Sequence, residues 1–108
     1  MNPLNSNDLY NKLITAGNEW ADNQSAYDML EGAKSSVLAR LMMNSKASSI
    51  AAKEMEAKAS TEYETYRLSV EGAQAKAIKS RVKYDSMKIW IELRRTEAAN
   101  DRAAMKLI

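Results

Sequence analysis

The sequence predicts an all-α protein: a long helical hairpin with a short connecting helix, coiled-coil-like and oligomeric. Two observations lead to this fold class. Only one proline and three glycines occur among the 108 residues, so little interrupts a helix. Apolar residues also recur at seven-residue spacing, which is typical of helices that pack along a seam. A single helical domain of residues 1–108 is small, so association with another chain would help to stabilise it.

The first helix is predicted over about residues 8–43, because the seven-residue repeat begins near its start and Ser6, Asn7 or Asp8 can cap it. Gly17 and Gly32 each weaken the helix by about 1 kcal/mol, so either position allows a kink or a close helix crossing. The sequence leaves open whether the helix is continuous through them. The two positions of the repeat are occupied by Leu9, Ala16, Asn23, Leu30 and Val37, and by Leu13, Trp20, Tyr27, Lys34 and Leu41.

A break follows at "MMNSKASSI", residues 42–50, where Asn44 can adopt the left-handed conformation that ends many helices. Ser48 or Ser49 can then cap a short amphipathic helix, predicted over 49–58. Ser60 or Thr61 can cap a long third helix, predicted over 61–105, which is about 65 Å long at 1.5 Å per residue.

The long helix is apolar on two faces. One stripe contains Ile78, Val82, Ile89 and Leu93, and nearly opposite to it lie Tyr84, Met87 and Ile91. One face can pack on the first helix, and we expect the other to bind a second chain. In the alternative, the short helix and the N-terminal segment cover it. The second stripe continues a seven-residue series, so the predicted oligomer interface consists of Tyr63, Val70, Ala77, Tyr84, Met87, Trp90 and Ile91. The number of subunits and their parallel or antiparallel sense stay open.

The residues of catalysis are scarce in this chain. It has no histidine and no cysteine, which excludes Ser–His–Asp and Cys–His nucleophiles and thiolate metal sites. The glycines are isolated, so no phosphate-binding loop is present. We therefore predict a protein that is not an enzyme, with no cofactor, no metal and no small-molecule substrate.

No run of apolar residues approaches the roughly 20 that a membrane-spanning helix needs, and the N-terminus does not resemble a signal peptide. Together with the lack of cysteine, these features predict a cytoplasmic protein without a membrane partner.

Charge is distributed unevenly. Residues 73–108 contain 9 basic and 4 acidic side chains, whereas residues 1–72 contain 7 basic and 10 acidic ones. This asymmetry favours an anionic partner for the last helix, although a solvated helix face would look the same. Tyr84 and Trp90 could stack on single-stranded bases, but aromatic residues at helical spacing are more often core or interface residues. The candidate nucleic-acid or partner-binding residues are Lys76, Lys79, Arg81, Lys83, Lys88, Arg94, Arg95 and Arg102.

Three stretches carry a family resemblance: "AKSSVLARLM" (33–42), "SSIAAKEMEAKASTEYETY" (48–66), and a run with Arg81, Tyr84, Glu92, Arg95, Glu97 and Arg102. Over roughly residues 25–105 the chain resembles small all-helical bacteriophage and prophage proteins encoded among early-region genes for single-strand annealing and recombination. The resemblance implies an accessory role in phage DNA metabolism, in the cytoplasm of the host cell. It marks Lys34, Tyr63, Arg81, Tyr84 and Arg95 as candidates and implies no catalytic residue.

The predicted function is that of a non-enzymatic phage accessory protein for DNA recombination or replication. It would act as a homo-oligomer whose basic C-terminal helix engages single-stranded DNA or a DNA-bound recombinase. An alternative is an adaptor or an inhibitor of a host protein, for example one of a defence system. A virion-assembly component is a third, weaker alternative.

Overall fold

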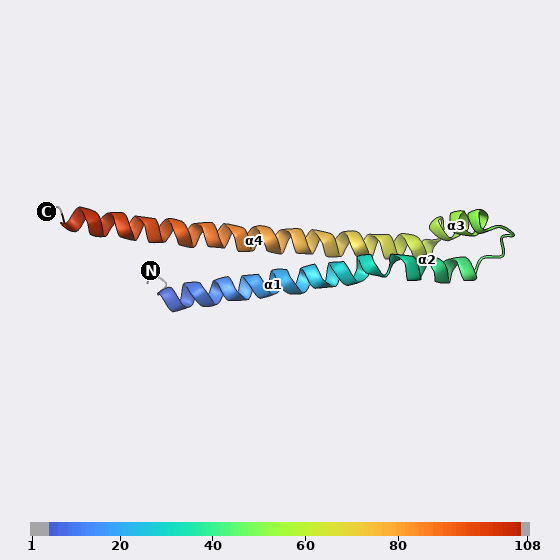
Figure 1. The fold of residues 1–108 in the computed structure, drawn as a ribbon, viewed down its shortest axis with the longest axis horizontal. Coiled ribbons are helices and arrows are strands. Elements are labelled where there is room, and N and C mark those ends of the chain that lie inside the picture. Colours follow the sequence, from blue (N-terminus) through green and yellow to red (C-terminus); the bar gives the residue numbers. More distant parts are fainter. Residues whose placement is uncertain (1–4, 107–108) are drawn as a thin grey trace. The chain divides into compact units, whose positions relative to one another are not determined.

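Residues 5–106 are described by a computed structural model, and this part of the chain is helical almost throughout (Figure 1). It contains four α-helices in the order α1 (Ser6–Gly32), α2 (Lys34–Met43), α3 (Ile50–Lys58) and α4 (Thr61–Lys106). The described residues include no strand. The predicted all-α class is confirmed.

The helix predicted over 8–43 is divided in the structure, at one of the two glycines where the sequence left its continuity open. α1 ends at Gly32, Ala33 is a turn residue, and α2 begins at Lys34. At this point the Ala33 N–H donates to the Leu30 carbonyl oxygen at 3.2 Å, three residues back instead of four. The flexible backbone of Gly32 favours such an interruption. Gly17, by contrast, lies inside α1, so the helix is continuous there.

Serine and asparagine side chains start three of the helices. The Ser49 side chain accepts from the Ala52 N–H at 3.1 Å, and Ser60 Oγ accepts from the Tyr63 N–H at 3.2 Å. Both serines were among the predicted caps. For α1 the prediction was wrong, because Asn5 Oδ1 accepts from the Asp8 N–H at 2.8 Å.

The end of α2 also differs from the prediction. Asn44 has φ −84° and ψ −8°, a right-handed conformation, and its N–H still donates to carbonyl oxygens of the last turn. The chain therefore leaves α2 by tightening the last turn, without a left-handed residue.

Contacts divide the chain into two compact units. The first combines the chain up to Ala21 with the chain from Ile78 onward, and the second consists of Asp22–Ala77. The single domain of residues 1–108 stays a prediction.

In the first unit α1 and α4 pack antiparallel. Rising residue numbers in α1 meet falling numbers in α4: Leu13 lines a groove with Ile91, and Ala16 lines another with Met87. Ala16 is only 2% exposed. Small residues on α1 thus provide the space that larger side chains of α4 occupy.

The closest approach in this unit is made by Gly17. A Cβ atom at this position would lie 3.3 Å from Cε2 of Tyr84, which is closer than ordinary van der Waals contact. On the next turn, the Trp20 ring lies 5.5 Å from the Tyr84 ring, measured between centroids, at an interplanar angle of 34°. The lack of a side chain at Gly17 therefore allows Tyr84 to pack between the two helices.

The second unit is built around the turn between α2 and α3, which lie side by side (Figure 1). Ser45 Oγ donates to Glu56 Oε2 at 2.8 Å across this turn. Ala57 on α3 is 3% exposed. The pKa of Glu54 is lowered because Lys58, one turn along α3, donates a hydrogen bond to its carboxylate.

Tyr66 connects α4 to the end of α1 within the second unit. Its hydroxyl donates to the Leu30 carbonyl oxygen, one of the last carbonyls of α1. Burial raises the pKa of Tyr66, and the carboxylate of Glu31 adds to this effect. The phenol is therefore held in its neutral, hydrogen-bond-donating form.

Replacing Gly72 by alanine should stabilise the protein by about 1 kcal/mol, because a Cβ there meets nothing within 4 Å and alanine favours the helix. The matched change Gly17→Ala gains the same helix propensity but must displace Tyr84. We expect its net effect to be about 1 kcal/mol less favourable than that of Gly72→Ala. Urea unfolding followed by circular dichroism measures both, and equal gains would contradict the close contact at Gly17.

The raised pKa of Tyr66 predicts that its contribution to the unfolding free energy depends on pH in the alkaline range. Its pKa is higher in the folded than in the unfolded chain, so its contribution is complete below the unfolded pKa of about 10 and is lost as pH rises through the folded pKa. The difference in unfolding free energy between the wild type and Tyr66→Phe should therefore shrink from pH 9 upward. A difference that stays constant to pH 11 would show that the hydroxyl is not buried as described.

Candidate interaction surfaces on α4

Most of the residues predicted to form an oligomer interface are partly covered by the chain itself. Tyr63, Val70, Tyr84, Met87 and Ile91 are half-buried. Ala77, another member of the set, is 3% exposed. Trp90 differs from the rest, because 41% of its surface is exposed.

In the first unit the residues that cover this set come from α1. Tyr84 packs on Gly17 and Trp20, and Ile91 lies beside Leu13. In this unit the matching seven-residue repeats of α1 and α4 thus cover the second stripe within one chain. The oligomer interface itself stays a prediction.

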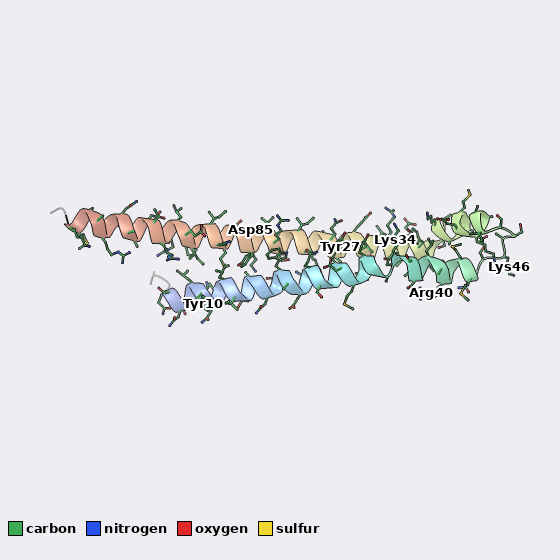
Figure 2. All side chains as sticks on the ribbon, in the orientation of Figure 1. Tyr10, Tyr27, Lys34, Arg40, Lys46 and Asp85 are labelled. Atoms are coloured by element: carbon green, nitrogen blue, oxygen red, sulfur yellow. The ribbon has the colours of Figure 1, made fainter. Side chains whose placement is uncertain are left out.

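The other apolar face of α4 is open to solvent. We call it the outer stripe; it consists of Ile78, Val82, Ile89 and Leu93, which are 55%, 57%, 65% and 55% exposed. All four belong to the first unit. Asp85, labelled on α4 in Figure 2, lies within the same turns of the helix as Val82 and Ile89. The outer stripe is thus an exposed apolar surface in two parts, Ile78 with Val82 and Ile89 with Leu93, and exposed apolar surface of this kind is characteristic of an interaction site.

The candidate basic residues fall on two sides of the outer stripe. At 100° per residue, one group projects from one edge of α4 and the other from the opposite edge. The first group contains Lys76, Lys79, Lys83 and Arg94. The second group, which we call the basic row, contains Arg81, Lys88, Arg95 and Arg102, each seven residues after the last and each exposed. Seven residues of helix rise by about 10 Å, so the basic row presents cations at regular intervals along α4.

Several of these cations have partners in the chain. Lys83 Nζ lies 3.1 Å from Glu19 Oε2 and so connects α4 to α1 in the first unit. Arg81 Nε lies 3.8 Å from Asp85 Oδ2. Because both ion pairs are exposed to solvent, each contributes little to stability.

The end of the basic row is different. Within residues 5–106, neither Arg95 nor Arg102 forms an ion pair, and both line a shallow open hollow on α4 together with Glu92 and Thr96. Every residue from 92 to 106 is exposed. The last turns of α4 are therefore the part of the basic surface most accessible to an anionic ligand.

The two predicted stacking residues have separated roles. Tyr84 is packed against Trp20 and is withdrawn from any base. Trp90 is exposed, and the Arg94 guanidinium carbon lies 5.1 Å from its ring centroid, a cation–π contact. Of the two, only the Trp90–Arg94 pair presents a flat surface to solvent.

Trp20 itself was not a predicted site residue. Its indole Nε1 is buried and has no hydrogen-bond partner among the residues that the structure describes. Its place in the seven-residue repeat indicates that the ring is packed. Whether the indole N–H has a hydrogen-bond partner depends on the groups of the facing helix, which the repeat does not reveal.

Two further kinds of site are absent from the described part of the chain. Residues 5–106 contain no group of three or more acidic side chains placed to hold a metal ion. Nor does this part of the chain contain a helix of sufficient length and apolar character to cross a membrane.

Comparison with known proteins gave no match to a protein-family model, to a curated protein or to a solved structure. The surfaces of α4 must therefore be interpreted from their own chemistry.

The seam and the outer stripe should respond differently to truncation. Tyr84→Ala removes a ring packed on Gly17 and Trp20 and should cost about 2 kcal/mol or more of unfolding free energy. Ile89→Ala on the outer stripe should change it by no more than about 0.5 kcal/mol, measured in dilute solution where chains are separate. Equal losses in urea unfolding would mean that the assignment of the two faces is wrong.

Proposed function

We propose that the protein binds single-stranded nucleic acid through the basic row of α4 and has a binding role, not a catalytic one. The observation that supports this most directly is the regular spacing of Arg81, Lys88, Arg95 and Arg102 along one exposed edge of the helix. A straight row of cations can follow the phosphates of a nucleic acid without reading its sequence.

The surroundings of the row favour a flexible strand as ligand. Trp90 is exposed on the same helix and carries a cation on its ring through Arg94. Aromatic faces of this kind stack on unpaired bases with little sequence preference. A duplex hides its bases, so the combination of phosphate contacts and one stacking surface suits a single strand better.

The strongest part of the proposed site is the exposed end of α4. Arg95 and Arg102 form no ion pair with the described residues, whereas Arg81 forms one with Asp85. Phosphate contacts should therefore concentrate on Arg95, Arg102 and the neighbouring Arg94. Such a protein would act as an accessory factor in DNA recombination or replication, on the strand itself or beside a recombinase bound to it. A phage setting, which the sequence resemblance implies, is part of this proposal.

Salt dependence provides the test. Binding of a fluorescent single-stranded oligonucleotide should weaken steeply as salt rises, and Arg95→Gln with Arg102→Gln should lower the slope of log affinity against log salt by about 1.4, or 0.7 per lost contact. The loss should be the same for different base sequences. The matched control, Arg40→Gln with Lys46→Gln, removes the same charge from exposed residues outside α4 and should leave the slope unchanged.

Two results would overturn the proposal. One is the lack of binding at low salt. The other is an equal loss in both double variants, because binding would then depend on net charge and not on the basic row.

A further inference from the structure

We infer that the outer stripe is the contact surface between two copies of this chain, and that the two α4 helices pack antiparallel on it. This inference goes beyond nucleic-acid binding and does not depend on it. The seam with α1 occupies the opposite face of α4, so the outer stripe is available in the folded first unit.

The apolar residues of the outer stripe are symmetric about a point between Asp85 and Ser86. Ile78 and Val82 lie one turn apart, and Ile89 and Leu93 repeat this spacing eleven residues later. If a second α4 lies antiparallel, Ile78 meets Leu93 of the second copy and Val82 meets Ile89 of the second copy. Each contact occurs twice by symmetry, which gives four apolar layers over about 22 Å of helix.

Charged residues along one edge of the stripe match in the same register. In chain order this edge reads Arg81, Asp85, Lys88 and Glu92, so the signs alternate. The charged residues beside the stripe do not pair at the same level as the apolar ones. Each faces the residue of the second copy that lies two positions, or about half a turn, further along than the apolar pairing would give. Arg81 then faces Glu92 of the second copy, and Asp85 faces Lys88 of the second copy. All four pairs created by the two-fold axis are of opposite charge.

The other edge contains no opposing like charges. There Lys79 faces Trp90 of the second copy, a cation beside an indole ring, and Lys83 faces Ser86 of the second copy. A parallel pair of helices is less favourable, because Glu92 would face Glu97 of the second copy. Asp85 lies near its own counterpart in both arrangements and does not distinguish them. The charge pattern therefore selects a second copy of this chain in the antiparallel sense.

An antiparallel dimer leaves only the end of the proposed nucleic-acid site open, because Arg81, Lys88 and Trp90 take part in the contact. Arg95 and Arg102 lie beyond Leu93, outside the four apolar layers. The two copies would place these arginines at opposite ends of the contact. Four layers of partly exposed aliphatic side chains form a small interface, so we expect a reversible dimer that dissociates on dilution.

Cysteine cross-linking tests the sense of packing, because the natural sequence contains no cysteine. Chains with Ile78→Cys should form a disulfide with chains carrying Leu93→Cys when the two are mixed in a redox buffer. Either variant alone should remain uncross-linked, because its two thiols would lie about 22 Å apart. Adding Ile89→Asp to both chains should abolish the cross-link. Disulfides in a single variant as strong as in the mixture, or no disulfide in the mixture, would overturn the inference.

Charge reversal tests the register independently. Arg81→Glu and Glu92→Arg should each raise the dissociation constant in sedimentation equilibrium by about 5- to 10-fold, since each converts attractive pairs into repulsive ones. Both changes in one chain should restore the wild-type constant within about twofold. Mixing the two single variants should likewise give a heterodimer tighter than either homodimer.

A monomeric wild-type chain across the whole concentration range would refute self-association, and a double variant no better than the single ones would refute this register. A pure nucleic-acid-binding monomer would still bind the oligonucleotide, so failure of the dimer and failure of the proposed function can be distinguished.

Discussion

The packing of Tyr84 against Gly17 and Trp20 is the contact on which the other surfaces of this protein depend. It fixes which face of α4 is turned toward α1 in the first unit. A helix that has buried one face must present the opposite one, so the outer stripe and the basic row follow from this contact. A larger residue at Gly17 would displace the Tyr84 ring from this contact.

The sequence predicted the helical class, the seven-residue repeat and the serine caps, because these depend on residues close together in the chain. The seam positions of the first helix are half-buried or buried, with the exception of Lys34, which is exposed. Asn23 is half-buried in the seam as its spacing indicated. The division at Ala33 was signalled only by the weak helix former Gly32 before it, and glycines inside helices are too common a feature to settle continuity.

The choice between the two apolar faces of α4 could not be predicted from α4 itself. Both stripes have helical spacing, and the aliphatic residues of the outer stripe are, if anything, more apolar than Tyr84, Met87 and Ile91. What decides between them is the complementary surface on α1, where Ala16 and Gly17 leave space for Met87 and Tyr84. The same holds for the basic residues. The sequence predicted Lys83 and Arg95 as equal candidates for binding a partner, and only the neighbouring helix shows that Lys83 forms an ion pair with Glu19. Pairing between distant segments is therefore the information that local patterns lack.

The two tryptophans occupy opposite environments, and this gives the protein two built-in optical reporters. Trp20 has a buried indole nitrogen in the seam, whereas Trp90 is exposed beside Arg94 on the outer side of α4. Emission from a buried indole occurs at shorter wavelength than emission from a hydrated one, so the two fluorophores can be separated. Separation of α1 from α4 in the first unit would shift the fluorescence emission of Trp20. Binding of a ligand or a second chain to the outer side of α4 would quench or shift the emission of Trp90. The chain can thus report internal rearrangement and external contact separately without an attached dye.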